Sequence, residues 1–215
     1  CIRDRGYRKN SNAAPIKETI AAGIIDLARV RSNSTVCDPF CGSGTFLIES
    51  ALKALNIPPC INRKFAAEKW DCIDASVWRN ERQRAISLVN KSAEFKAFGF
   101  DIDEESVRLS IDNSAKAGVK SRIRIEQADI CDFQPMNAIT VCNPPYGERM
   151  LEIREAEQLY KIMGEVFKPD SENPCYVISP HEDFERFFGK KADKKRKLYN
   201  GMIKCCLLYT SPSPR

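Results

Sequence analysis

The tetrapeptide Asn143-Pro144-Pro145-Tyr146 is the most chemically specific stretch of the sequence. Each proline fixes its φ angle and removes a backbone donor, so the turn is rigid and nearby carbonyl groups stay unpaired. With the amide oxygen of Asn143, the carbonyls near Asn143 and Pro144 can accept both hydrogens of a planar exocyclic amine. The ring of Tyr146 can stack on an extruded base. We therefore expect these residues to hold an amine for attack on a methyl group, without a metal or a strong general base.

A second candidate site is the stretch Asp38-Pro39-Phe40-Cys41-Gly42-Ser43-Gly44-Thr45. Residues 35–37 predict a short buried strand and a helix is expected from Thr45, which gives the strand–turn–helix corner of nucleotide-binding folds. Gly42 and Gly44 allow the backbone to pass close beneath a ligand. The turn lacks the lysine of a phosphate-binding loop, and Asp38 would repel a polyphosphate. A ligand with an ammonium or sulfonium group fits better, which favours S-adenosylmethionine over ATP or NAD.

Two further acids, Asp101 and Asp129, follow the predicted strands 96–101 and 121–127. In dinucleotide-binding folds an acid about 20 residues after the glycine turn holds the ribose. Here 57 positions separate Gly44 from Asp101, so this role requires residues 58–96 to be an insertion. Asp101 can then accept two hydrogen bonds from a ribose diol, and Asp129 can accept one from an adenine amino group. The alternative for either acid is a helix N-cap or an exposed loop end.

Strands alternate with helices along the chain, which predicts an α/β fold with a doubly wound, mostly parallel sheet. An Asn-Gly pair at 200–201 predicts a terminal hairpin, so the last strand is expected to run antiparallel. Candidate ligand-binding residues then follow the carboxyl ends of strands, where such sheets bind ligands. The remaining expected strands are 138–142, 175–179, 194–200 and the stretch from Met202. The expected helices are 15–29, 45–55, 151–167 and 181–188. A further helix is expected to be capped by Asp103, with Val107, Ile111 and Ala115 on its inner face.

The composition is that of a single folded domain. The chain has 215 residues, of which 43% are hydrophobic, and a net charge of +5, which permits a nucleic-acid partner without requiring one. It contains no apolar run long enough for a membrane span. Ten cysteines without a Cys-x-x-Cys pair, and a single histidine, favour reduced thiols in a cytoplasmic protein over a zinc site.

Several motifs together resemble a known family. The glycine turn with Asn143-Pro144-Pro145-Tyr146 is similar to class I S-adenosylmethionine-dependent methyltransferases that act on amino groups. The wider match resembles the bacterial large-subunit ribosomal RNA guanine-N2 methyltransferases, which carry a THUMP domain. It rests on Arg5-Gly6-Tyr7-Arg8, Ala14 to Thr19, Asn143 to Arg149 and Arg196 to Gly201.

The resemblance implies a Rossmann-like seven-stranded sheet and a role for each matching residue. Pro15 and Thr19 would border the methionine end of S-adenosylmethionine. Asp101 would hold the ribose and Asp129 the adenine. The cofactor floor would be formed by Asp38, Phe40, Gly42 and Gly44, and the flipped guanine would be held by Asn143, Pro144 and Tyr146. The expected partner is ribosomal RNA, with no metal and no membrane; the oligomeric state is left open.

The two ends of the chain differ from the central domain at 13–205. Residues 1–12 are basic and are expected to be a linker from a missing N-terminal THUMP region, either a solvated tail or an RNA-facing arm. The family's THUMP domain helps to bind RNA, and nothing in this chain corresponds to it. Residues 206–215 resemble a translated sequencing adapter, so we expect them to be non-native and the chain to be a fragment.

The run at 190–197 is basic at six of its eight positions. Such a run is either a solvated face or a rim that contacts RNA phosphates. The residues concerned are Lys190, Lys191, Lys194, Lys195 and Arg196. Two other functions stay open: methylation of DNA adenine or protein glutamine by the same Asn-Pro-Pro-Tyr chemistry, and an inactive fragment that binds cofactor and RNA.

Overall fold

The computed structural model describes residues 5–8, 15–61, 63–147, 150–170 and 172–210. It contains a seven-stranded sheet in the order β3-β2-β1-β4-β5-β7-β6. The first five strands in this order run parallel to one another, and β7 runs antiparallel to both β5 and β6. The strands are β1 (Thr35–Asp38), β2 (Lys96–Asp101), β3 (Ile123–Gln127), β4 (Ile139–Cys142), β5 (Cys175–Ser179), β6 (Lys194–Asn200) and β7 (Ile203–Tyr209).

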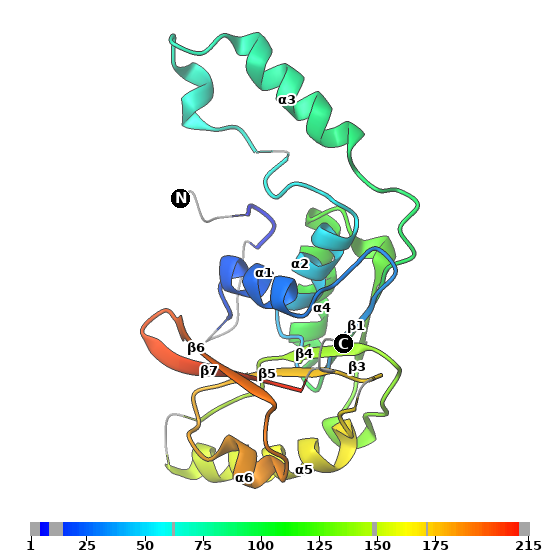
Figure 1. Ribbon diagram of the computed structural model, residues 1–215, viewed down its shortest axis with the longest axis vertical. Coiled ribbons are helices and arrows are strands. Elements are labelled where there is room, and N and C mark those ends of the chain that lie inside the picture. The colour runs from blue at the N-terminus through cyan, green and yellow to red at the C-terminus, as the bar shows by residue number, and fades with distance from the viewer. Residues whose placement is uncertain (1–4, 9–14, 62, 148–149, 171, 211–215) are drawn as a thin grey trace.

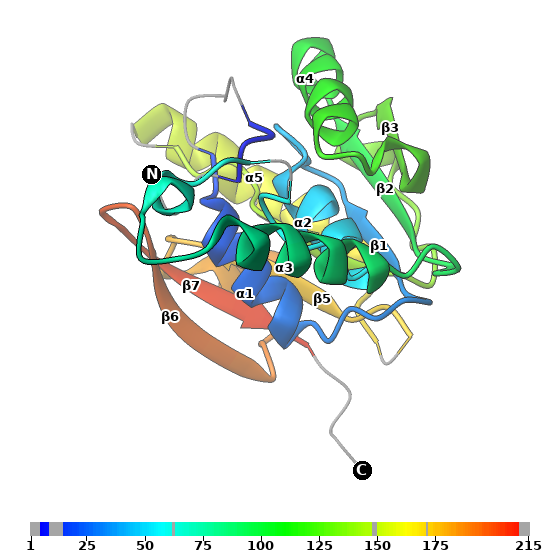
Figure 2. The same cartoon turned by 90° about the horizontal axis from the view of Figure 1, so that it is seen from above.

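Helices cover both faces of this sheet (Figure 1). On one face, α1 (Glu18–Leu27) and α2 (Thr45–Ala54) enclose a core with Val36, Val141 and Leu207, and α4 (Glu104–Lys116) lies beside α2. On the other face, α5 (Met150–Phe167) and α6 (Phe184–Phe188) pack on Cys142, Val177 and Leu208. Seen from above, α4 with β2 and β3 lies at one side of the molecule and the β6–β7 hairpin at the opposite side (Figure 2). The predicted doubly wound sheet with an antiparallel last strand is confirmed.

The first helix begins later than the sequence predicts. Lys17 is extended (φ −68°, ψ 137°), so α1 starts at Glu18 rather than at Pro15. The side chain of Asn200 keeps this segment extended, because its Oδ1 accepts from the Lys17 N–H at 3.3 Å and its Nδ2 donates to the Pro15 carbonyl at 3.5 Å. A hydrogen bond from the far end of the chain thus sets the helix start.

The inner face of α4 also differs from the prediction. Asp103 caps this helix as expected, with its carboxylate accepting from the N–H groups of Glu105 and Ser106. The predicted face held Val107, Ile111 and Ala115, but Ala115 is exposed and Ile111 only half-buried. The buried residues are mostly small and polar: Ser106, Val107, Ser110, Asn113 and Ser114.

Residues 5–8 are part of the packed domain and not a solvated tail. Tyr7 lies in the core, and its hydroxyl donates to Glu49 Oε1 at 2.9 Å. Arg5 forms an ion pair with the same carboxylate at 3.4 Å, and Arg8 pairs with Glu18 at 3.1 Å. The rest of the predicted linker lies outside the described residues.

Residues 63–92 form an arm that projects from the body (Figure 1). It contains the short 3-10 helix η1 (Ala66–Lys69) and the helix α3 (Ala75–Ser87), joined by a stack of Phe65 on Trp78 with ring centroids 6.4 Å apart. No described residue from 56 to 92 is buried. The arm therefore contributes nothing to either core.

The last strand runs through residues that the sequence assigns to a non-native tail. β7 pairs with β5 as far as Tyr209, and Leu207, Leu208 and Tyr209 are buried. The expected boundary at 205/206 stays a prediction, since the fold shows only how these residues pack.

Candidate active site

Four of the candidate residues lie along one edge of the sheet. Asp38 and Asp101 are the last residues of β1 and β2, and Asp129 and Asn143 follow β3 and β4. Because these parallel strands are neighbours in the order β3-β2-β1-β4, their carboxyl ends meet at one edge. The predicted cofactor acids and the predicted acceptor turn are thus brought together.

Asp38 is a buried acid at the centre of this edge. Its side chain is 1% exposed, and Oδ1 accepts from the Phe40 N–H at 3.1 Å. Burial raises the pKa of Asp38 well above its usual range, and the nearby charge of Asp101 raises it further. Among the described residues no cationic side chain pairs with Asp38. A ligand carrying positive charge would offset the cost of this buried carboxylate.

Asp101 clamps the glycine turn to the end of β2. Its Oδ2 accepts from the Gly42 N–H at 2.9 Å, and its Oδ1 accepts from the Asp103 N–H at 3.0 Å. The Cys41 N–H donates to the Phe100 carbonyl at 2.9 Å in the same region. Each carboxylate oxygen can accept a second hydrogen bond, so Asp101 can position the turn and still bind a diol.

The two glycines of the turn have different surroundings. Gly42 has a φ of +50°, and a Cβ there would meet nothing within 4 Å. Gly44 has a φ of +78°, and its Cβ would lie 2.3 Å from the hydroxyl of Ser110 on α4. The Asn113 side chain, also on α4, donates to the Ser43 carbonyl at 3.0 Å. Gly42 therefore faces open space, whereas Gly44 allows α4 to pack on the turn.

A cavity of about 190 Å³ lies between the ends of β1, β2 and β3. Asp129 is at its rim and caps the 3-10 helix η3 (Ile130–Asp132), accepting from the Cys131 N–H at 2.8 Å. This hydrogen bond lowers the pKa of the Asp129 carboxyl, which stays ionised. Mostly apolar walls with a few acceptors, Asp129 among them, suit a flat aromatic ring that carries an amino group. The other lining residues are Pro39, Phe100, Ala128, Ile130, Asp132, Phe133, Gln134 and Met136.

The acceptor turn, residues 143–146 after β4, is supported by Tyr160 of α5. Asn143 and Tyr146 are half-buried and Pro144 is buried. The hydroxyl of Tyr160 on α5 donates to the Pro145 carbonyl at 3.2 Å. Burial raises the pKa of Tyr160, so this hydroxyl keeps its proton.

Tyr160 itself is fixed by two rings at the end of β5. Its centroid lies 4.7 Å from that of Phe184 and 5.7 Å from that of His181. Tyr160 is fully buried, whereas Leu159 beside it is partly buried against the same core. Its hydroxyl would not have been identified from apolar spacing alone.

The remaining predicted cofactor residues lie beside Asp38 or at the start of α1. Phe40 follows β1 and packs against the core on the α5 side. Pro15 is half-buried before α1, where its carbonyl meets Asn200, and Thr19 is exposed on the first turn of α1.

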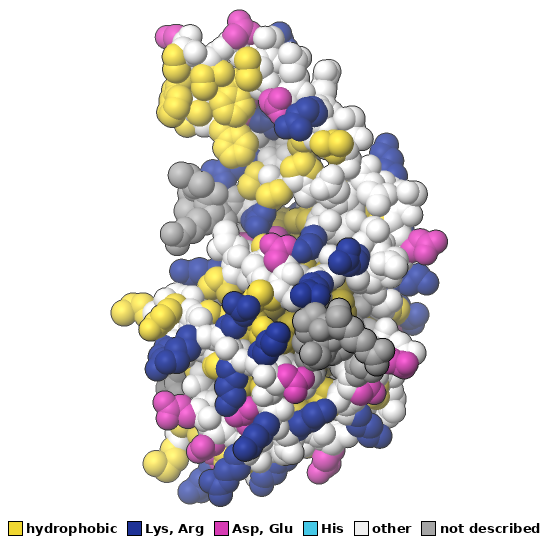
Figure 3. Space-filling view, viewed as in Figure 1, with side chains coloured by type: hydrophobic (Ala, Val, Ile, Leu, Met, Phe, Trp, Pro, Cys, Tyr) yellow, Lys and Arg dark blue, Asp and Glu magenta, His cyan; other side chains and the backbone are white. Residues whose placement is uncertain are grey.

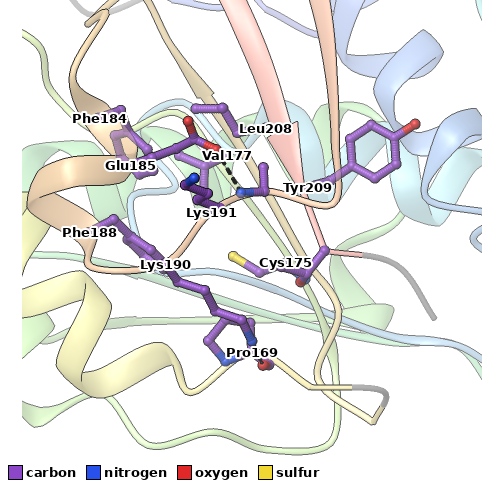
Figure 4. A pocket seen from close by; sticks show the side chains of 12 residues that line it. Pro169, Cys175, Val177, Phe184, Glu185, Phe188, Lys190, Lys191, Leu208 and Tyr209 are labelled. Atoms are coloured by element: carbon purple, nitrogen blue, oxygen red, sulfur yellow. Dashed lines mark hydrogen bonds between the residues drawn. The ribbon is translucent and has the colours of Figure 1, made fainter. Parts of the chain in front are cut away.

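The basic run at 190–197 is divided among different contacts. Lys190 donates to the Pro169 carbonyl at 2.6 Å, Lys195 pairs with Glu185, and Arg196 donates to the Tyr209 hydroxyl at 3.3 Å. Lys191 and Lys194 are exposed. Figure 4 shows Lys190 and Lys191 around an apolar cavity of about 20 Å³, which is too small for a ligand larger than water.

Three general observations complete the description. The nine described cysteines are free thiols, and burial raises the pKa of Cys37, Cys41 and Cys142. Within the described residues no group of three or more His, Cys, Asp or Glu side chains could hold a metal ion. None of the described helices is long and apolar enough to cross a membrane.

Comparison with known proteins identifies the family. The family model described as "RMKL-like, methyltransferase domain" matches residues 5–209. YpsC of Bacillus subtilis (strain 168), named as a candidate RNA methyltransferase, is 40% identical over 94% of this chain and 53% of its own length. The ribosomal RNA large subunit methyltransferase K/L of Shewanella sp. (strain W3-18-1) is 38% identical over 97% of this chain and 31% of its own length.

A solved structure gives the same result. SMU.472, named as a candidate methyltransferase and crystallised with SAH, superposes with a TM-score of 0.92 at 38% identity, covering all of this chain and 56% of that one. The chain thus spans about half the length, or less, of the relatives it matches. Because the family model covers nearly the whole chain, the chain belongs to the RMKL-like methyltransferase-domain family.

Proposed function

We propose that this domain transfers a methyl group from S-adenosylmethionine to the exocyclic N2 amine of a guanine in large-subunit ribosomal RNA. The observation that carries the proposal is the position of the Asn143 turn beside Asp38. β1 and β4 are adjacent, with Cys37 opposite Thr140, so Asp38 and Asn143 both emerge at the same edge. A donor held over β1 and an acceptor held after β4 are therefore neighbours.

The donor is S-adenosylmethionine, and the site offers a partner for each of its parts. Asp101 would accept from the ribose hydroxyls, and the cavity rimmed by Asp129 would take the adenine. Gly42 leaves the space above the turn open. Asp38 would lie nearest to the positive charge, which offsets the burial of its carboxylate. Phe40, Gly44, Pro15 and Thr19 would complete the pocket by shaping the turn and bordering the methionine end.

The acceptor residues work by orientation. The Asn143 side-chain oxygen and the neighbouring carbonyl would accept the two amine hydrogens, which directs the nitrogen lone pair at the methyl carbon. As the nitrogen–carbon bond forms, the carbon–sulfur bond breaks and its electron pair stays on sulfur. The proton then leaves the methylated nitrogen for water. Tyr146 would stack on the base and Pro144 would keep the turn rigid.

The RNA substrate is supported by the names of the relatives. The K/L relatives are named as large-subunit ribosomal RNA methyltransferases, and YpsC as a candidate RNA methyltransferase. The basic net charge of +5 agrees with a polyanionic substrate. The names support RNA over DNA adenine or protein glutamine as the acceptor, whereas the charge favours a nucleic acid over a protein without separating RNA from DNA.

The test is a product analysis with the full chain. It is incubated with S-adenosylmethionine carrying a labelled methyl group and with undermodified ribosomal RNA, DNA or release factor. Nucleoside and peptide analysis then locates the label. We expect N2-methylguanosine in large-subunit RNA. Label only in DNA or protein, or at another atom of the RNA, would contradict the proposal.

A further inference from the structure

The β6–β7 hairpin extends past the rest of the sheet at the carboxyl edge. β6 runs parallel to β5, because both are antiparallel to β7, so β6 ends at the same edge as β4 and its Asn143 turn. The last rung of β5 pairs Ser179 with Cys206, whereas the hairpin continues to Asn200 opposite Ile203. It therefore projects about 10 Å beyond β5, at about 3.3 Å per residue.

The projecting part carries large apolar side chains in water. Tyr199 is 63% exposed, and Met202 at the turn is 99% exposed. Figure 3 shows hydrophobic side chains at the tip of this hairpin with Lys and Arg side chains next to them. Lysines on the preceding part of β6 protect an open strand edge from pairing, but that role does not explain an exposed tyrosine and methionine at the turn.

Two lysines flank the tyrosine on the same face. Lys204 lies directly opposite Tyr199 in the register, and Lys197 is two residues before it on β6. Both are exposed, and neither forms an ion pair with any residue that the structure describes. An aromatic ring between two free ammonium groups matches a single strand of nucleic acid, in which a base stacks and the adjoining phosphates are negative.

This face is also the one on which the acceptor turn is supported. Tyr199 has the same orientation as Lys197 and Lys195, which lie opposite Cys206 and Leu208. Those two residues pack in the core with Tyr160, which donates to the Pro145 carbonyl. A single-stranded RNA whose base is held at the acceptor turn can therefore continue across Tyr199 without crossing the β-sheet.

The hairpin is held in a defined position. Asn200 is 8% exposed, and its side chain bonds to the backbone of Pro15 and Lys17 before α1. Gly201 has a φ of +70°, which permits the tight turn. The hairpin that carries Tyr199 is thus fixed on the domain, so it does not have to become ordered when a ligand binds.

We propose that Tyr199, with Lys197 and Lys204, is a stacking site for a nucleotide of single-stranded RNA flanking the base held at Asn143. The proposal rests on the proposed function for the identity of the nucleic acid. It joins Tyr199 and Lys204 to Lys197, the last residue of the basic run at 190–197, in a site that lies outside the cofactor pocket.

The test measures RNA affinity without turnover. The full chain is titrated into an end-labelled, single-stranded fragment of ribosomal RNA, and the fluorescence anisotropy gives Kd. Tyr199→Ala should raise Kd roughly tenfold, while Tyr199→Phe should stay within about twofold of the unsubstituted chain, since stacking needs only the ring. Lys197→Gln and Lys204→Gln should each lower the slope of log affinity against log salt by about 0.7.

Matched controls lie on other surfaces. Trp70→Ala removes an aromatic ring that is 59% exposed on the arm, and Lys116→Gln removes an exposed lysine at the end of α4. Both should leave Kd and the salt slope unchanged. Thermal unfolding and cofactor affinity should be the same for all variants, because every substituted side chain is largely in water.

The outcomes separate this inference from the proposed function. RNA affinity that is absent, or equal in the unsubstituted chain and Tyr199→Ala, overturns the stacking site even if ribosomal RNA is methylated. An equal loss with Trp70→Ala overturns it too, because the effect would then be non-specific. A Tyr199-dependent Kd with no methyl transfer to ribosomal RNA supports the site and contradicts the proposed function.

Discussion

The carboxyl edge of the sheet has a donor half at β1 and β2 and an acceptor half at β4, and the two halves are built in different ways. At β1 and β2, the turn is fixed by backbone hydrogen bonds to Asp38 and Asp101 and by packing of Gly44 on Ser110. At β4, the acceptor turn is stiffened by two prolines, supported by the Tyr160 hydroxyl and followed by Gly147, which packs closely on Glu152 of α5. A network of hydrogen bonds suits a donor that is the same in every turnover, whereas a turn stiffened by prolines leaves carbonyl groups available to a base that enters from a polymer.

The substitution Asn143→Ala should affect the acceptor half without affecting the donor half, and it has the largest expected effect. It removes the acceptor oxygen for the amine, and we expect the rate of methyl transfer to fall by about 10²–10³. Cofactor affinity, measured by calorimetry, should stay within about twofold, since the side chain lies in the acceptor half. Loss of cofactor affinity together with activity would place Asn143 in the donor half and end the distinction.

The pH dependence of stability tests Glu49, which lies on α2 behind the glycine turn of the donor half. Burial raises its pKa from 4.5 to about 7, although Arg5 and Tyr7 lower it in part. The folded state therefore holds this proton more tightly than the unfolded state. The contribution of Glu49 to stability is therefore fully present below pH 4.5 and is lost as pH rises through 7, by roughly 3 kcal/mol.

The comparison of Glu49→Gln with the unsubstituted chain isolates this effect. Chemical denaturation at a series of pH values gives the free energy of unfolding of each protein. The difference between the unsubstituted chain and Glu49→Gln should change between pH 4.5 and about 7. Glu81→Gln, at an exposed glutamate of α3, should show no such change. Parallel pH profiles for all three proteins would mean that Glu49 is ionised normally.

Gly44→Ala and Gly42→Ala sharpen the comparison within the turn. Gly44→Ala should lower the free energy of unfolding by about 2 kcal/mol, because its Cβ meets Ser110. Ser110→Gly should restore part of that loss. Gly118→Ala, with a φ of +74° and open surroundings, measures the backbone strain alone.

Gly42→Ala should instead act on the ligand. We expect a stability loss similar to that of Gly118→Ala, but a clear rise in the dissociation constant for S-adenosylmethionine. If Gly44→Ala weakened the cofactor more than Gly42→Ala at equal stability, the assignment of the two glycines would be reversed.

The smallest expected effect is that of Tyr160→Phe in the acceptor half. Loss of one hydrogen bond costs about 1 kcal/mol, so kcat should fall roughly fivefold with cofactor affinity unchanged. Tyr209→Phe removes a buried hydroxyl that meets Arg196 instead and should leave kcat unaltered. A drop in thermal stability without a change in kcat would show that Tyr160 only fills the core.

The sequence predicted the residues that end strands, because alternation and apolar runs locate strands and a polar residue at their ends is visible. It did not predict Ser110 and Asn113, since their burial depends on the space left by Gly44 and not on hydrophobicity. It placed Arg5 and Arg8 in a tail because their acidic partners, Glu49 and Glu18, are identifiable only after folding. The start of α1 depends on Asn200, 183 positions away from Lys17.

We expect the arm at 63–92 to open independently of the rest of the domain. It is tied to the body by hydrogen bonds such as those from Asn56 to the Leu88 carbonyl and from Asn90 to the Leu55 carbonyl, and none of its described residues is buried. Its amide hydrogens should therefore exchange with solvent through local opening, while those of β1 and β4 exchange only when the whole domain unfolds. A single melting temperature would report the second process and miss the first.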